Sequence, residues 1–358
     1  MKRREFLEKS SLATGAALLA SSANATTINR EKANPAKQNS GQANIKIGLY
    51  SISYLGIWYN GPALTFEEMV KRAKDVGYDG IELDNKRPLG NPMDLNQAAR
   101  DKMRNLVEKN GMEIPCVAAN NDFSSPIQEQ REMQLLMVKE TIKLAADVGA
   151  KIVRLFAAWF GVPIHNGIGT YDFVRGDFYT YERKYPYVTR IDKWSYVREC
   201  LKEVTGFAEE YGITLVLQNH PPLTDHWKDC YNMVKEVNSE NLKVCLDLPM
   251  MIKHDKEWVE NAVRTVGNLQ THSHFGGEYF RDSSGKVQQK VISSKFGKPL
   301  PDYGHFLELM DEISYNGWFT FELCHPVLTD SHEVAGIEYV HEQVELAHEF
   351  MKDIINSM

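Results

Sequence analysis

Residues 319–323 read Phe-Thr-Phe-Glu-Leu and follow the turn sequence Tyr-Asn-Gly-Trp at 315–318. The apolar run predicts a buried strand, and Glu322 is its one charged residue. Burying an unpaired charge costs several kcal/mol, so this carboxylate requires a cation, a proton or a metal ion beside it. Other apolar runs of the chain also end in Asp, His or an amide, and this convergence is the main functional signal.

Short apolar runs alternate with longer amphipathic segments from residue 45 to the C-terminus. The runs predict strands at 46–52, 80–84, 113–119, 151–156, 213–219, 242–248, 269–275 and from Trp318 onward. Predicted helices follow them at 65–76, 96–109, 126–148, 194–211, 225–237, 256–266, 301–314 and 337–355. Eight strand–helix units are the number found in a closed parallel barrel.

The first predicted turn reads Ser-Tyr-Leu-Gly at 53–56 and lacks the Gly-x-Gly-x-x-Gly pattern of dinucleotide-binding open sheets. We therefore expect one α/β domain, a single (β/α)8 TIM barrel over residues 45–358. No second domain is expected.

The N-terminus has the pattern of an export signal. Arg3 and Arg4 precede a weakly apolar run at 12–20, and the small-residue triplet Ala-Asn-Ala follows at 23–25. This order predicts a twin-arginine signal peptide at 1–25, followed by a disordered linker at 26–44. A basic amphipathic helix would explain neither the paired arginines nor the triplet. We expect a periplasmic mature protein without a membrane anchor, because the apolar run is too short to span a bilayer.

The composition restricts the partners. The chain has 358 residues, of which 43% are hydrophobic and 25% charged, and a net charge of −7. An acidic protein is a poor match for a phosphate backbone, so no nucleic-acid partner is expected. Five cysteines without Cys-x-x-Cys spacing predict buried structural thiols and no disulfide framework.

Polar residues at the ends of four consecutive predicted strands form the candidate site: Gln218, Asp247, His274 and Glu322. Catalytic groups of parallel barrels lie at these strand ends. A lone strand histidine is more often a hydrogen-bonded core residue, but four such positions favour a metal or substrate site. Carboxylate, imidazole and amide ligands suit one divalent ion such as Mn²⁺, Mg²⁺, Co²⁺ or Zn²⁺.

Several stretches carry a family resemblance: GIELD at 80–84, LVLQNH at 215–220, VCLD at 244–247, HSHFGGEYFR at 272–281 and YNGWFTFE at 315–322. From residue 45 onward the chain resembles the xylose-isomerase-like barrels, which include sugar isomerases, epimerases and endonuclease IV relatives. The sugar epimerase branch is the most similar. The resemblance implies metal ligands at Asp247, His274 and Glu322 and a substrate-binding role for Arg281.

The sequence departs from the epimerase pattern at Gln218, where the family often has a Glu that is both ligand and acid/base group. A Gln can still offer a carbonyl oxygen to a metal, but it cannot exchange a proton. Met250 also stands where those epimerases place a substrate-contacting His.

These departures leave Glu322 as the predicted base for a proton next to a carbonyl. The expected second proton carrier is His220, Glu82 or His165. Structural alternatives are a pair between Glu82 and Arg154, and a His220 that only fixes its own loop. Asn219, Trp159 and His165 are expected to contact the substrate together with Arg281.

The segment 160–191 is long, irregular and rich in Tyr and Phe. Aromatic faces stack on sugar rings, and a closing loop would exclude water from the reaction. A contact between two copies of the chain in a homo-oligomer is an equally good explanation of these aromatic residues.

Three hypotheses follow. The first is a metal-dependent isomerase or epimerase that acts on a non-phosphorylated sugar or keto-sugar. The second is a lyase that performs β-elimination on a 3-keto-glycoside, and the missing second carboxylate at Gln218 favours it. The third is a sugar-binding barrel without turnover. A DNA-repair role is excluded by the acidic charge and by too few metal ligands.

Overall fold

The computed structural model describes residues 45–169, 185–291 and 300–358. Eight parallel strands close into a barrel in the order β1-β12-β9-β8-β7-β4-β3-β2. They are β1 (Lys46–Tyr50), β2 (Gly80–Asp84), β3 (Cys116–Ala118), β4 (Ile152–Leu155), β7 (Thr214–Gln218), β8 (Leu242–Cys245), β9 (Gln270–Gly276) and β12 (Trp318–Glu322). The predicted TIM barrel is confirmed, whereas the predicted signal peptide and linker lie outside the described residues.

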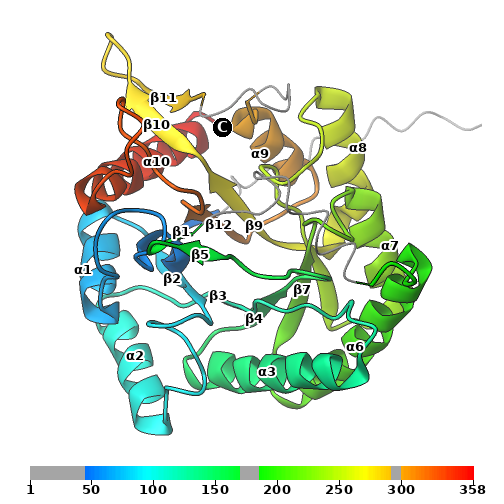
Figure 1. Cartoon of the computed structure of the whole chain (residues 1–358). Coiled ribbons are helices and arrows are strands. Elements are labelled where there is room, and N and C mark those ends of the chain that lie inside the picture. The colour runs from blue at the N-terminus through cyan, green and yellow to red at the C-terminus, as the bar shows by residue number, and fades with distance from the viewer. Residues whose placement is uncertain (1–44, 170–184, 292–299) are drawn as a thin grey trace, which may run out of the picture. The chain divides into compact units, whose positions relative to one another are not determined.

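A helix follows each barrel strand along the chain, and the helices form an outer ring around the strands (Figure 1). They are α1 (Phe66–Val76), α2 (Gln97–Lys109), α3 (Gln128–Asp147), α6 (Arg190–Glu210), α7 (Trp227–Val237), α8 (Lys256–Val266), α9 (Tyr303–Glu312) and α10 (Ile337–Ser357). Two single turns of 3₁₀ helix, η1 (Ser51–Tyr54) and η2 (Gly267–Leu269), are the other helical elements of the described residues.

Local sequence explains where these helices start. Thr65 and Glu68 form a capping box at the start of α1, and Gly77 ends the helix with a φ of 107°. Helix α6 starts before the expected position 194, because Thr189 and Asp192 form a second capping box. The spacing of apolar residues, from which the start of this helix was predicted, gives no information about the cap.

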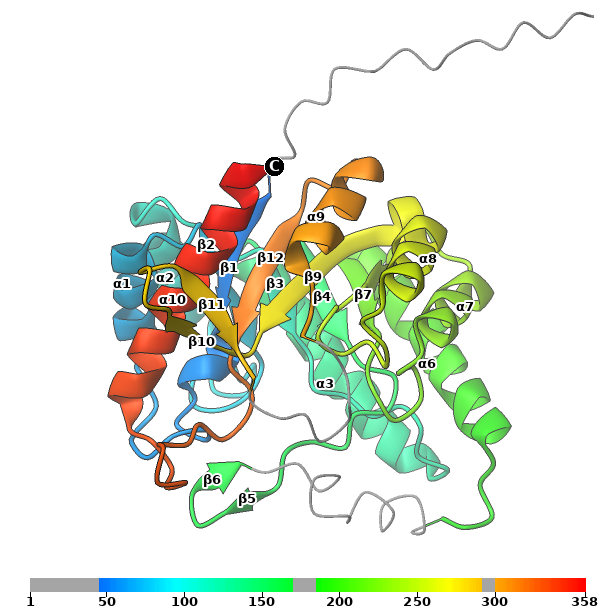
Figure 2. The ribbon, with the colours of Figure 1, turned by 90° about the horizontal axis from the view of Figure 1, so that it is seen from above.

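The register of the strands places chosen side chains at one end of the barrel. Tyr50 lies beside Glu82, Thr320 beside His274 and Glu322 beside Gly276. Because alternate residues of a strand share a face, Thr320 lies one layer deeper in the barrel than Glu322. The strands point toward the end where β5 (Ile164–His165) and β6 (Ile168–Gly169) lie (Figure 2).

Two short antiparallel sheets lie outside the strands that the sequence predicted. One is β5–β6, and the other joins β10 (Glu278–Arg281) to β11 (Val287–Lys290). Residues with positive φ, Asn166 and Gly167, form the first turn. The predicted aromatic lid is therefore described only in part: Tyr171, Phe173, Phe178, Tyr179 and Tyr181 lie outside the described residues.

No disulfide joins the five cysteines, all of which lie in the described ranges, and four of them are buried, as predicted for structural thiols. Across the described ranges, no helix has the length and apolarity that a membrane crossing requires.

Candidate functional site

A cavity of about 280 Å³ opens at the C-terminal ends of the barrel strands. One part of its wall is aromatic and is formed by Tyr50, Trp58, Phe156 and Trp159. The polar lining residues are Lys86, Asn120, Arg154, Gln218, His220, Glu322 and His325. An apolar wall with a few convergent polar groups is typical of a small-molecule site.

Asp247, His274 and Glu322 come together at this end of the barrel. Each offers one ligand atom, and these atoms lie within 4.8 Å of one another. Asp247 follows β8, His274 lies in β9, and Glu322 is the last residue of β12. All three side chains are buried. The structure thus brings together three of the four residues that the sequence proposed as metal ligands.

Asp247 has one carboxylate oxygen that lacks a partner. Its Oδ2 accepts a hydrogen bond from Gln218 Nε2 at 2.5 Å and lies 3.1 Å from His274 Nδ1. Its Oδ1 is buried and has no hydrogen-bond partner in the described part of the chain. Because such a group is costly unless something pairs with it, this oxygen fits a bound cation.

Glu322 is buried at 8% exposure, and no described residue donates a hydrogen bond to it. Burial raises the pKa of Glu322 to about 7; the nearby His274 opposes this rise, and Asp247 reinforces it. A carboxyl group with a pKa near neutral can exchange a proton at working pH.

Glu82 lies one layer deeper and has several donors. Its Oε1 accepts from Arg154 Nε at 3.0 Å, and its Oε2 lies 2.7 Å from His272 Nε2, 2.9 Å from His274 Nε2 and 2.5 Å from Thr320 Oγ1. Burial alone would raise the pKa of Glu82, but the charges of His274, His272 and Arg154 hold it well below the usual range. Glu82 is therefore a buried anion that does not line the cavity.

His274 lies between two carboxylates, Glu82 on Nε2 and Asp247 on Nδ1. Burial favours the neutral ring, yet the Glu82 charge and the bond to Asp247 raise the pKa of His274 well above its usual value. A metal-ligating imidazole usually donates its other N–H to a carboxylate, which fixes the ring. Glu82 occupies that position for a His274 that would bind a metal through Nδ1.

Gln218 departs from its expected role. Arg154 Nη1 donates to Gln218 Oε1 at 2.5 Å, and Gln218 Nε2 donates to Asp247. A guanidinium only donates and a carboxylate only accepts, so these partners fix the orientation of the amide. The carbonyl oxygen expected to bind a metal is therefore held by Arg154, which leaves Asp247, His274 and Glu322 as the candidate ligands.

Trp159, an expected substrate contact, and His220, an expected proton carrier, line the cavity. Trp159 and His220 pack edge to face, with ring centroids 4.6 Å apart. His220 Nδ1 lies 2.6 Å from the carbonyl oxygen of Pro221, and burial lowers the pKa of His220 to about 4. His220 thus holds its own loop, as the structural alternative proposed, and also faces the cavity.

Three other expected contacts lie elsewhere. Asn219 Nδ2 donates to the backbone carbonyl of Asp247, and Asn219 Oδ1 accepts from the backbone N–H of Asp247. Asn219 therefore positions Asp247, a candidate metal ligand. Arg281 turns outward on β10 and pairs with Glu349 of α10. The hairpin β10–β11 redirects the chain after Gly277, whose φ is 103°. His165 is exposed on β5 and does not line the cavity.

Sequence reasoning missed Lys86. Its ammonium pairs with Asp84 at 3.2 Å and also donates to Asn120. Tyr50, likewise missed, donates to the same Asp84. Burial lowers the pKa of Lys86, and the Asp84 charge opposes this effect. The position of Lys86, two residues after the strand-end Asp84, is the signal that could have identified it.

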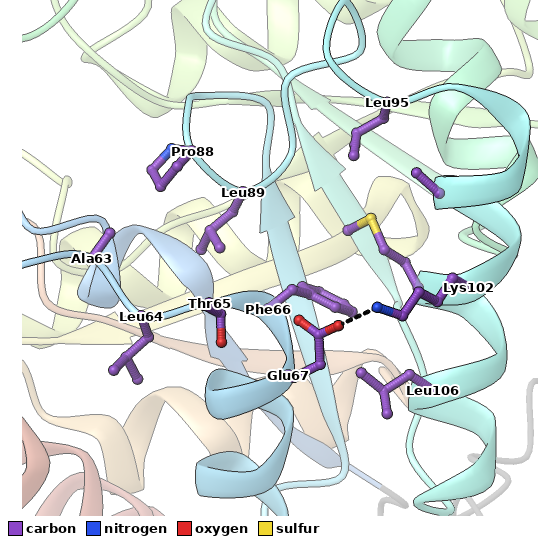
Figure 3. A pocket seen from close by; sticks show the side chains of 12 residues that line it. Ala63, Leu64, Thr65, Phe66, Glu67, Pro88, Leu89, Leu95, Lys102 and Leu106 are labelled. Carbon is purple, nitrogen blue, oxygen red and sulfur yellow. Dashed lines mark hydrogen bonds and ion pairs between the residues drawn. The ribbon is translucent and has the colours of Figure 1, made fainter.

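A second cavity, of about 440 Å³, lies between α1 and α2 on the outside of the barrel (Figure 3). Its lining is mainly apolar, and its charged residues Glu67 and Lys102 pair with each other at 2.6 Å. It contains no cluster of chemically reactive groups.

Residues 70–354 match the family described as "Xylose isomerase-like TIM barrel". The chain belongs to this family. The family resemblance read from the strand-end motifs is thereby confirmed. No curated protein sequence matches the chain.

Several solved structures with a similar fold are sugar epimerases. A D-psicose 3-epimerase solved in the presence of D-fructose is 18% identical, with a TM-score of 0.62, and the match covers 87% of this chain and 99% of that chain. A 3-keto-D-glucoside 4-epimerase from E. coli is 15% identical, with a TM-score of 0.57 and coverages of 85% and 98%. The IOLI protein with a bound zinc atom is 15% identical, with a TM-score of 0.61 and coverages of 87% and 99%.

Proposed function

We propose that this protein is a metal-dependent sugar isomerase or epimerase that removes a proton next to a carbonyl of a non-phosphorylated sugar or keto-sugar. The observation that carries the proposal is the buried, unpartnered Asp247 Oδ1 beside His274 and Glu322 at the end of the barrel. The family and the sugar-epimerase neighbours support the same reaction class.

The donor set fits one divalent ion such as Mn²⁺, Mg²⁺, Co²⁺ or Zn²⁺. Asp247, His274 and Glu322 would hold it, and Glu82 would orient His274. When bound, such an ion polarises a carbonyl or enediolate oxygen and makes the neighbouring C–H more acidic. The zinc-bound neighbour adds support from the same fold.

Glu322 is the proposed base. It ends β12 at the cavity, it has no donor among the described residues, and its pKa is raised to about 7. These properties favour the uptake of a proton from carbon at neutral pH. Trp58, Phe156 and Trp159 give the cavity flat apolar faces on which a sugar ring can stack.

A 3-keto-glycoside lyase is the second candidate, and one observation favours it. Gln218 cannot exchange a proton, and Arg154 and Asp247 hold its amide. Glu322 is the one carboxylate among the described residues that line the cavity. β-Elimination requires a single strong base, whereas epimerisation by two opposed carboxylates requires two.

The test is incubation of the Mn²⁺-loaded protein with D-fructose and, separately, with methyl 3-keto-D-glucoside in D₂O. NMR would record deuterium at the carbon next to the carbonyl, isomeric sugars and released methanol. Isomeric sugar supports the leading proposal, and methanol supports the lyase. A protein that binds these sugars after chelation but never exchanges the proton is a binding barrel, which would overturn both enzyme proposals.

Export remains part of the proposal. The paired Arg3 and Arg4 and the triplet at 23–25 support cleavage after residue 25 and a periplasmic location. Expression of the full chain beside an Arg3→Lys/Arg4→Lys variant tests this. We expect the wild type in the periplasmic fraction with residue 26 at its N-terminus, and the variant in the cytoplasm.

A further inference from the structure

His325 lies three positions after Glu322 and lines the same cavity. Its side chain is 25% exposed, and its Nε2 lies 3.0 Å from Glu278 Oε1. In the described part of the chain, no group bonds to its other ring nitrogen, Nδ1.

Glu278 is a built anchor for that ring. It lies on β10 at 4% exposure, and its Oε2 accepts from Tyr339 of α10 and from Lys290 of β11, the latter at 3.2 Å. Burial would raise the pKa of Glu278, but the hydrogen bonds from His325 and Tyr339 and the nearby charge of Lys290 lower it to about 2. The carboxylate is therefore ionised, so Nε2 of His325 is the protonated nitrogen that donates to it.

This arrangement decides what Nδ1 can do. With the proton of the neutral ring on Nε2, the Nδ1 lone pair is free to accept a second proton. The imidazolium that forms is stabilised by the Glu278 anion, which is held in place by Lys290 and Tyr339. A buried carboxylate behind an imidazole is the arrangement that makes His an efficient proton carrier.

The other imidazole that lines the cavity is less suited. His220 Nδ1 is engaged by the Pro221 carbonyl at 2.6 Å, and the ring packs against Phe156 and Trp159. No described carboxylate bonds to it. Of the other expected carriers, Glu82 and His165 do not line the cavity.

We propose that His325, positioned by Glu278, carries the proton of the substrate oxygen while Glu322 carries the proton of the carbon. The proposal rests on the proposed function. When Glu322 takes the C–H proton, that electron pair forms the C=C bond and the carbonyl π pair moves to oxygen. Before this step Nδ1 of His325 takes a proton from solvent water, so the ring is an imidazolium. This Nδ1 proton passes to the carbonyl oxygen. When the carbonyl forms again, Nδ1 takes the proton back. In β-elimination the enolate pair instead re-forms the carbonyl, the C=C pair moves to the neighbouring carbon, and the C–O pair leaves with the oxygen, which takes the Nδ1 proton; solvent water then protonates Nδ1 again.

The experiment uses the Mn²⁺-loaded protein and methyl 3-keto-D-glucoside in D₂O, and it compares two rates. One is deuterium incorporation next to the carbonyl, and the other is product formation, as isomeric sugar or methanol. The variants are His325→Asn, Glu278→Gln and Glu322→Gln. His332→Asn is the matched control, because His332 is an exposed histidine between β12 and α10 that does not line the cavity.

We expect the ratio of product to exchange to fall about 100-fold in His325→Asn, which is typical for the loss of a general acid. Glu278→Gln should lower the same ratio less, and Glu322→Gln should lose both rates. Tyr339→Phe keeps the Glu278–His325 pair, so it should change the ratio least and shows whether damage to folding explains the Glu278 result.

A wild-type ratio in His325→Asn would overturn this proposal while the proposed function stands. Equal loss of both rates in His325→Asn would also overturn it, because His325 would then share the role of Glu322. A wild type that neither exchanges nor converts the probe would overturn the proposed function, and this inference with it.

Discussion

Glu82 and Glu322 are buried glutamates inside the same barrel, one layer apart, yet their surroundings differ. Two imidazoles, a guanidinium and a hydroxyl surround the carboxylate of Glu82, whereas no described residue donates a hydrogen bond to Glu322. The pKa of Glu82 is held well below its usual range, and that of Glu322 is raised to about 7. Donors, rather than burial alone, decide which carboxylate is structural and which can react.

The largest effect is expected from Glu322→Gln. Loss of a general base typically lowers the rate about 10²- to 10⁴-fold. Folding should not suffer, because the amide removes a buried charge that has no donor. The turnover number of the variant assayed in excess Mn²⁺ tests the effect on the reaction, and urea unfolding of the metal-free variant tests the effect on folding. An unchanged turnover number would remove Glu322 from the reaction.

Glu82→Gln makes the same substitution at the glutamate that has several donors, and it should lower the free energy of unfolding. Removing one partner of a buried ion pair costs about 3–5 kcal/mol, because Arg154 would remain buried without its counter-ion. Urea unfolding of the metal-free wild type, Glu82→Gln and Glu322→Gln measures this cost. Equal free energies of unfolding for the two variants would contradict the contrast drawn between the two sites.

A smaller effect with a defined sign is expected from pH. A glutamate in an unfolded chain has a pKa of about 4.3, and folded Glu322 has a pKa of about 7. Stabilisation by protonated Glu322 is therefore complete below about pH 4.3 and is lost as the pH rises toward about 7. Glu82 has the opposite sign, because its lowered pKa gives stability above about pH 4.3 that is lost as the pH falls.

The measurement is urea unfolding of metal-free protein from about pH 4.3 to pH 7, the window between the two pKa values of Glu322. The wild type should lose stability relative to Glu322→Gln as the pH rises through this window. Its stability relative to Glu82→Gln should depend much less on pH in the same window. A constant difference between wild type and Glu322→Gln would show that the pKa of Glu322 is not raised.

The barrel and the three candidate ligands could be predicted from the sequence because both depend on local patterns. Strand-length apolar runs gave the β/α alternation, and the polar residue at the end of each run identified Asp247, His274 and Glu322. The layer of side chains beneath these candidate ligands was harder to predict from the sequence. His272 and Thr320 each stand two positions before a candidate ligand, and this spacing would have placed them beneath the site.

Contacts made by irregular chain could not be predicted in this way. Arg281 was expected at the substrate because it follows His274 closely, but a hairpin turns it toward Glu349. The Glu278–His325 pair joins residues 47 positions apart, through elements that have no periodic signal. The role of Gln218 depends on the buried Arg154 beside it, which the spacing along the chain does not reveal.

Metal binding tests the central claim most directly. Isothermal titration of the chelator-treated protein with Mn²⁺ would compare wild type, Asp247→Asn, Glu322→Gln and the exposed control Asp94→Asn. We predict one ion per chain in the wild type and in the control, and loss of binding in Asp247→Asn and Glu322→Gln. A wild type that binds none of Mn²⁺, Co²⁺, Zn²⁺ or Mg²⁺, or an Asp247→Asn variant that binds as the wild type does, would contradict the account.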